Sequence, residues 1–151
     1  MININIVCVG ALKEKFWIDA VSEYGKRLSR FCKLKILELP QQEKFDKQKC
    51  LEGEGDEILR AARGYKILLD IEGKQLTSNE LAEKIEKVSL FNSEITFIIG
   101  GSYGVSEKVK EQADFRLSFG KITLPHNLAR VVLVEQIYRA FMIISGSTYH
   151  K

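Results

Sequence analysis

The sequence predicts an α/β fold with a mainly parallel sheet and helices on both faces, in one domain spanning residues 1–151. Short apolar runs rich in β-branched residues alternate with longer segments that repeat apolar residues at helical spacing. The run at residues 67–69 is continuously apolar and the run at 95–99 almost so, as in strands covered on both faces. The chain is 45% hydrophobic and 28% charged, with only 2 prolines, so its composition marks no linker between domains.

The first half of the chain alternates strand and helix. Residues 4–9 are apolar except for Asn5 and stop at Gly10, which predicts a buried strand. Residues 14–31 carry apolar side chains at helical spacing and predict an amphipathic helix, and residues 35–39 form a second strand before Pro40. The next two elements are a polar loop at residues 41–49 and a helix at residues 50–62, which two glycines weaken by about 1 kcal/mol each.

The second half continues the alternation. Residues 65–71 form the third strand, and a turn at residues 72–74 follows. Thr77 and Glu80 have the spacing of a capping box, which predicts a helix with an apolar stripe through Val88. The remaining elements before the last loop are a strand at residues 95–99, a glycine-rich loop at 100–104, a short helix from its cap Ser106 to Ala113, and a strand at 115–119.

An ordered loop at residues 117–127 separates the last strand from the most apolar helix of the chain. Asn127 is a favourable N-cap residue, so we expect the helix to span residues 128–145. This helix is apolar on more than one face, which predicts that it is buried and that part of it meets another subunit.

Several classes of protein are disfavoured by composition. No apolar run reaches the ~20 residues that span a bilayer, and the first residues lack the features of a signal peptide, so we expect a cytoplasmic protein without a membrane partner. Cys8, Cys32 and Cys50 match neither a disulfide framework nor a zinc pattern. We therefore expect reduced thiols and no metal.

A basic cluster lies at the end of the first helix and the start of the second strand. It consists of Lys26, Arg27, Arg30, Lys33 and Lys35. Two interpretations remain open: the cations follow a phosphate backbone, or they complement the dipole of a solvated helix end.

Ligands of parallel α/β sheets bind beyond the carboxyl ends of the strands, where three loops meet: those after Asp70, Ile99 and Ser118. The glycines at 100–104 allow close approach of the backbone to a ligand, although a structural turn explains them equally well. The spacing is neither a Walker loop nor a dinucleotide fingerprint. The backbone of residues 119–124 suits an adenine ring, and no nucleophile, carboxylate pair or second metal ligand lies near His126.

Three segments together resemble the RlmH family of ribosomal RNA large-subunit methyltransferases. They are residues 98–104, residues 117–128, and residues 134–140 leading to 149–151. The resemblance covers essentially the whole chain. It implies a SPOUT-type fold with a C-terminal trefoil knot, a homodimer, and S-adenosylmethionine bound in the knot. It also implies methylation of N3 of a pseudouridine in 23S rRNA of the large ribosomal subunit, on the assembled ribosome.

The family's site residues carry over to matching positions of this chain. The implied cofactor contacts are Leu68, Leu69, Gly100, Gly101, Phe119, Gly120, Lys121, Ile122, Thr123 and Leu124. The implied substrate-side residues are His126, Arg139, Tyr149, His150 and Lys151. Either His126 or His150 is the expected proton acceptor. Two alternatives to this function are a non-catalytic ribosome or RNA-binding module and a SPOUT methyltransferase with a different RNA target.

Overall fold

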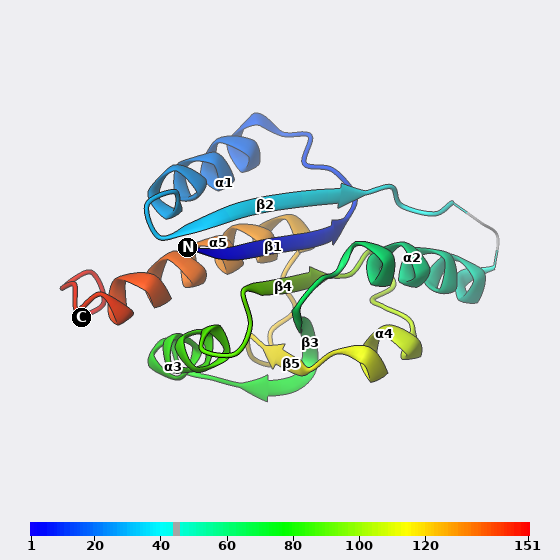
Figure 1. Cartoon of the computed structure of the whole chain (residues 1–151). Helices are drawn as coiled ribbons and strands as arrows, with labels where there is room; N and C mark the ends of the chain where they lie inside the picture. The colour runs from blue at the N-terminus through cyan, green and yellow to red at the C-terminus, as the bar shows by residue number, and fades with distance from the viewer. Residues whose placement is uncertain (44–45) are drawn as a thin grey trace.

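A five-stranded sheet forms the centre of the structure, a computed structural model that describes residues 1–43 and 46–151. The strand order is β2-β1-β4-β3-β5, and every neighbouring pair is parallel (Figure 1). The strands are β1 (Ile2–Val9), β2 (Cys32–Leu39), β3 (Tyr65–Gln75), β4 (Glu94–Ile99) and β5 (Phe115–Ser118). The helices are α1 (Lys15–Leu28), α2 (Lys47–Ala61), α3 (Ser78–Ser89), α4 (Glu107–Gln112) and α5 (His126–Ile144).

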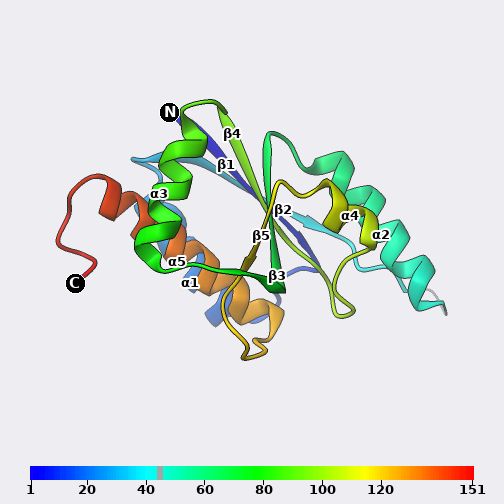
Figure 2. The ribbon, with the colours of Figure 1, turned by 90° about the horizontal axis from the view of Figure 1, so that it is seen from below.

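Helices cover both faces of the sheet, as the apolar strands predict (Figure 2). Side chains of β1 alternate between the faces, because successive residues of a strand point to opposite sides. Ile4 and Ile6 pack in the core beneath α1, α3 and α5, whereas Val7 and Val9 pack beneath α2 and α4. The predicted α/β class, with its parallel sheet and two helical layers, is therefore confirmed.

β2 and β3 extend furthest beyond their predicted ranges. β2 begins at Cys32, three residues before the expected start at residue 35, because it pairs with β1 from Ile2 onward. The prediction of a turn at residues 72–74 is wrong, because β3 continues to Gln75. Its pairing with β5 shifts register between Leu69 and Lys74, and the chain resumes pairing after this irregularity.

Helix boundaries depend on the caps. Asp46 caps α2 by accepting a hydrogen bond from the Gln48 amide, so the helix begins at Lys47 and the predicted loop is shorter than residues 41–49. Residues 44 and 45 of that loop lie outside the described residues. The capping box at Thr77 and Glu80 is confirmed.

The predicted cap of the last helix is wrong. α5 begins at His126 directly after Pro125, and Asn127 lies inside the first turn. Its Oδ1 is buried and has no hydrogen-bond partner among the residues that the structure describes. Pro125 is the N-cap residue, and it makes no side-chain hydrogen bond to the helix start.

No helix in the described part of the chain is long and apolar enough to cross a membrane. The three cysteines are buried and form no disulfide. Burial raises the pKa of both the Cys8 and Cys32 thiols to about 11. Thiolates are the reactive form, so these side chains stay protonated and shielded at neutral pH.

We expect Cys8 and Cys32 to resist alkylation by iodoacetamide at pH 8 in the folded protein. Both should react after denaturation in guanidinium chloride, where the thiol pKa returns to ~8.5. Mass spectrometry of peptides from native and denatured samples measures this. Rapid labelling of Cys8 in native protein would contradict its buried position beneath β2, where Sγ lies 3.4 Å from the Leu37 carbonyl oxygen.

Candidate active site

A cavity of about 510 Å³ lies at the carboxyl ends of the central strands. Residues 69–72 of β3 and the loops after β4 and β5 form its walls. The segments that follow Asp70, Ile99 and Ser118 therefore converge as predicted, although the first of them is part of a strand and not a loop. Its lining residues are Leu69, Asp70, Ile71, Glu72, Ile99, Gly100, Gly101, Ser102, Tyr103, Gly104, Val105, Lys110, Leu117, Phe119, Gly120, Ile122, Thr123, Leu124, His126 and Ala129. The volume falls within the range typical of small-molecule and cofactor sites.

The glycine loop (residues 100–104) makes a tight turn against the cavity. The amide of Gly104 donates a 3.0 Å hydrogen bond to the carbonyl oxygen of Gly101. Gly104 has a φ of +84°, which favours glycine. A Cβ at Gly100 would lie 2.6 Å from both the Gly104 carbonyl oxygen and a methyl carbon of Val105. This loop therefore depends on the absence of a side chain at position 100.

The opposite wall is the loop that follows β5. The Ser118 hydroxyl donates to the Ile71 carbonyl oxygen at 3.0 Å and accepts a hydrogen bond from the Gly120 amide at 3.1 Å. These bonds hold the loop against the end of β3. Phe119 and Ile122 are 36% and 80% exposed to solvent. Two large apolar side chains at this wall are therefore available for contact with a ligand.

Polar groups of the cavity carry both signs of charge. Asp70 forms an ion pair with Arg116 at 3.2 Å and accepts a hydrogen bond from the Glu72 amide at 3.0 Å. Glu72 and Lys110 also line the cavity. Within residues 1–43 and 46–151, no cluster of three or more His, Cys, Asp and Glu side chains could hold a metal ion.

His126 is held at the cavity rim by the start of α5. A Cβ at Gly10 would lie 3.7 Å from its Cε1 atom, so the imidazole is next to the loop that follows β1. One turn later, buried Arg130 donates to the Gly10 carbonyl oxygen at 3.0 Å and to Glu38 at 2.6 Å. The Arg130 contacts fix this loop against α5 and thereby limit where His126 can move.

Arg139, Tyr149 and His150 lie together with Glu135, away from the cavity. We call these four residues the tail cluster. Arg139 bonds the Glu135 carboxylate at 2.6 Å and approaches His150 Nδ1 at 3.1 Å. Its guanidinium lies 4.9 Å from the Tyr149 ring centre. Burial and then Glu135 raise the pKa of Tyr149, so its phenol stays protonated near neutral pH.

The tail cluster and the cavity are at opposite ends of α5. Thirteen residues separate His126 from Arg139, which at 1.5 Å per residue places them about 20 Å apart along the helix. The chain terminus lies beyond the amino end of β1, whereas the cavity loops follow the carboxyl ends of the strands (Figure 1).

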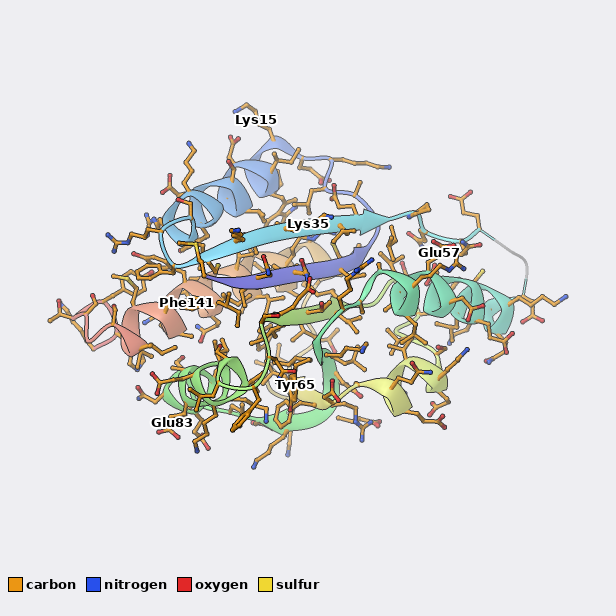
Figure 3. The ribbon with its side chains drawn as sticks, in the orientation of Figure 1. Lys15, Lys35, Glu57, Tyr65, Glu83 and Phe141 are labelled. Carbon is orange, nitrogen blue, oxygen red and sulfur yellow. The ribbon has the colours of Figure 1, made fainter. Side chains whose placement is uncertain are left out.

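The basic cluster adjoins the tail cluster. Arg27 lies over the rings of Tyr24 and Tyr138, and Tyr138 packs edge-on against Tyr149 with 4.9 Å between ring centres. Lys35, labelled on the edge strand β2 in Figure 3, points to the other face of the sheet, because its neighbours Leu34 and Ile36 pack with Phe141 on the face that α5 covers. Within the basic cluster, Arg27 therefore reaches the tail cluster through Tyr138, whereas Lys35 does not.

The structure brings most of the predicted cofactor residues into the cavity wall and leaves two outside it. Leu68 is fully buried in the core beneath α2 and α4, and Lys121 is exposed and outside the lining. Tyr103 and Lys110 line the cavity without having been identified from the sequence. Tyr103 could have been predicted, because it belongs to the glycine-rich loop after β4. Lys110 could not, because it is on α4, and only the folded arrangement brings that helix to the cavity.

Known structures share this fold. A methylase family protein from Haemophilus influenzae matches with a TM-score of 0.58 at 14% identity, over 99% of this chain and 71% of the other. A tRNA (m1G37) methyltransferase from Aquifex aeolicus matches with a TM-score of 0.55 at 14% identity, over 91% and 69%. A family model described as predicted SPOUT methyltransferase matches residues 2–150. Fold, cavity and family model together define the SPOUT class of methyltransferases.

Proteins of similar sequence show to which family of SPOUT methyltransferases the chain belongs. Proteins named ribosomal RNA large subunit methyltransferase H from Lactobacillus acidophilus and Streptococcus gordonii are 52% and 51% identical, each over 99% of both chains. A protein of the same name from Lactobacillus helveticus is 50% identical over the same shares. The chain belongs to the RlmH family.

Proposed function

We propose that this protein transfers a methyl group from S-adenosylmethionine to N3 of a pseudouridine in 23S rRNA of the large ribosomal subunit. The observation that carries the proposal is the full-length identity of about half to proteins named for methylation of this RNA. A structural neighbour, a Legionella pneumophila methyltransferase with a TM-score of 0.54 and 16% identity, was solved with bound SAM.

The cavity suits an adenosyl group. Leu69, Ile99 and Leu124 give it apolar walls that can flank a purine ring. Around them, the bends at the glycine loop and at Gly120, whose φ is +115°, turn main-chain polar groups toward a ligand without side-chain obstruction. We assign these groups, together with Gly101, residues 119–120 and residues 122–124, to cofactor binding.

Bound S-adenosylmethionine supplies a methyl group on a positively charged sulfur. Transfer forms a bond from the methyl carbon to N3, breaks the carbon–sulfur bond in line, and releases the N3 proton. His126 at the cavity rim or His150 of the tail takes this proton. Arg139 and Lys151 supply positive charge for the RNA phosphates.

We propose that two copies of the chain form the working enzyme. In one chain the tail cluster is about 20 Å from the cavity, along α5, so the tail of one copy completes the cavity of the other. Apolar side chains are available for such a contact, because Phe16 and Ile18 on α1 are 63% and 45% exposed. Under this proposal, the whole chain is one domain whose knotted C-terminal part holds the cofactor, and the enzyme works on cytoplasmic ribosomes.

We expect light scattering at micromolar concentration to give a mass near 34 kDa, twice the 17.2 kDa of one chain. Burial of the exposed apolar side chains of α1, and of Ile144 at the end of α5, drives this association. Replacing Phe16 with glutamate should shift the mass toward the monomer. A wild-type monomer at this concentration would remove the proposed arrangement of the tail.

The activity is tested with ribosomes from a strain lacking the corresponding enzyme. Wild-type protein and S-adenosylmethionine carrying a labelled methyl group should label the large-subunit RNA at one pseudouridine, located by mass spectrometry of nuclease fragments. Label in another RNA would assign a different target to the same fold. If calorimetry shows that the protein binds S-adenosylmethionine but the ribosomal RNA takes up no label, methyl transfer to ribosomes would be contradicted.

A further inference from the structure

A buried carboxylate lies directly behind the glycine loop. Glu54, on α2, is only 5% exposed. A Cβ at Gly101 would lie 3.2 Å from its Oε1 atom and 3.1 Å from Val9. Glu54 and Val9 therefore close the back of the loop, while the front of the loop lines the cavity.

The other carboxylate oxygen of Glu54 holds Gln42, shortly after the end of β2. Oε2 accepts a 2.9 Å hydrogen bond from the Gln42 amide. The neighbouring residue, Gln41, donates from its side-chain amide to the Ser102 hydroxyl at 3.2 Å. Glu54 thus acts on the glycine loop twice, by direct contact at Gly101 and through Gln42 and Gln41 at Ser102.

A third contact comes from the start of the same helix. Lys47 Nζ lies 5.1 Å from the centre of the Tyr103 ring, within the range of a cation–π interaction. At the other end of the loop, Gly55 allows α2 to approach Ser106 so closely that any side chain at position 55 would overlap its hydroxyl. Three consecutive loop residues and the cap of α4 are therefore all backed by α2 and the segment before it.

Placing a carboxylate in this position is energetically costly unless hydrogen bonds compensate for lost water. A small apolar residue would fill space behind Gly101 but would release the Gln42 amide. The arrangement therefore serves to fix the backbone of residues 41–42 and, through it, the glycine loop. α2 is the helix that carries the labelled Glu57 in Figure 3, and Glu54 is about one turn earlier in it.

We propose that Glu54 is a positioning residue that holds the glycine loop in the conformation that binds the cofactor. The proposal rests on the proposed function, because it takes S-adenosylmethionine as the ligand of that loop. Glu54 does not line the cavity, so its effect is on cofactor affinity through the loop, without contact to the reacting atoms.

The test compares Glu54→Ala, Glu54→Gln and the control Glu52→Ala. Glu52 is an exposed carboxylate on the same helix, bonded by Gln48 at 3.1 Å. We expect Glu54→Ala to weaken S-adenosylmethionine binding about tenfold, the size of one lost hydrogen bond to a charged group. Glu54→Gln should stay within about threefold of wild type, because its amide oxygen still accepts from the Gln42 N–H. Glu52→Ala should bind as wild type does.

Calorimetry gives the dissociation constants, and steady-state kinetics with ribosomes separate the two substrates. A positioning role predicts a raised KM for S-adenosylmethionine with an unchanged KM for ribosomes, and faster amide hydrogen exchange confined to residues 100–104 and 41–42. Equal affinity of Glu54→Ala and wild type would overturn the proposal, as would a parallel rise of both KM values. If wild type itself binds no S-adenosylmethionine, the proposed function fails instead.

A second variant keeps the proposal testable if Glu54→Ala does not fold. Gln41→Ala removes only the hydrogen bond to Ser102, and its wild-type side chain is at the surface. We expect about threefold weaker S-adenosylmethionine binding from the loss of this neutral hydrogen bond. An unchanged dissociation constant for Gln41→Ala would then overturn the proposal.

Discussion

Deleting residues 149–151 should lower methyl transfer by ~100-fold or more while leaving S-adenosylmethionine affinity within about twofold of wild type, because the tail supplies substrate contacts and one candidate proton acceptor. The tail cluster lies outside the cavity, so its loss leaves the cofactor walls intact. Calorimetry and a single-turnover methylation assay measure the two quantities. Parallel loss of both would show that the tail is structural, since Tyr149 also packs on Tyr138.

Two histidine variants locate the proton acceptor. His150→Ala retains the packing of Tyr149, and His126→Ala changes only the cavity rim. The variant that removes the acceptor should lose turnover by about 10²- to 10⁴-fold.

A mixed dimer tests whether the tail acts on the partner's cavity. Truncated chains keep the cavity, and chains with Gly100→Ala keep the tail. If the tail acts across the interface, mixing the two inactive proteins in equal amounts should restore about a quarter of wild-type activity, because half of the dimers are mixed and each has one complete site. Activity that stays at the level of the separate variants would place the tail at its own chain's site.

Replacing Gly100 with alanine should weaken cofactor binding and lower methyl transfer by about 100-fold, as expected when a binding loop moves by about 1 Å. The added methyl would lie 2.6 Å from the Gly104 carbonyl oxygen, and this backbone atom cannot rotate away as a flexible side chain can. The turn closed by the Gly104 amide must therefore open. Calorimetry with S-adenosylmethionine measures the loss directly.

Gly25→Ala is the matched control. Gly25 lies inside α1, and its added methyl would make an ordinary contact, 3.9 Å from Leu34. Alanine in a helix interior should raise stability by about 0.5–1 kcal/mol with no effect on cofactor binding. Gly100→Ala that binds as tightly as this control would contradict the account of the glycine loop.

The local sequence pattern predicted helices and strands well where residues within the element itself determine its position. The capping box at Thr77 fixed the start of α3, and the apolar runs of β3 and β4 indicated two covered faces. The predictions were wrong where pairing with a strand far away in the sequence determines the length of an element. β3 extends past Gly73 because Lys74 and Gln75 pair with β5, more than forty residues away in the chain. No local signal distinguishes this continuation from a turn.

The candidate site divides in the same way. The loops after Ile99 and Ser118 were predictable because parallel strands bring their carboxyl ends to one edge. The role of Glu54 was not predictable, because its sequence neighbours give it the pattern of an ordinary helix residue. Gly101, behind which it lies, is 47 positions later in the sequence. The separation of the tail cluster from the cavity likewise follows from the length of α5 in the folded chain.

The central claim is that the cavity between the glycine loop and residues 119–124 binds the adenosyl group of S-adenosylmethionine. Its most direct test is a crystal structure of the protein grown with this cofactor. The account predicts the adenine ring between Leu69, Ile99 and Leu124, with main-chain contacts to both loops. Density for the nucleoside at another place on the protein, with this cavity empty, would contradict it.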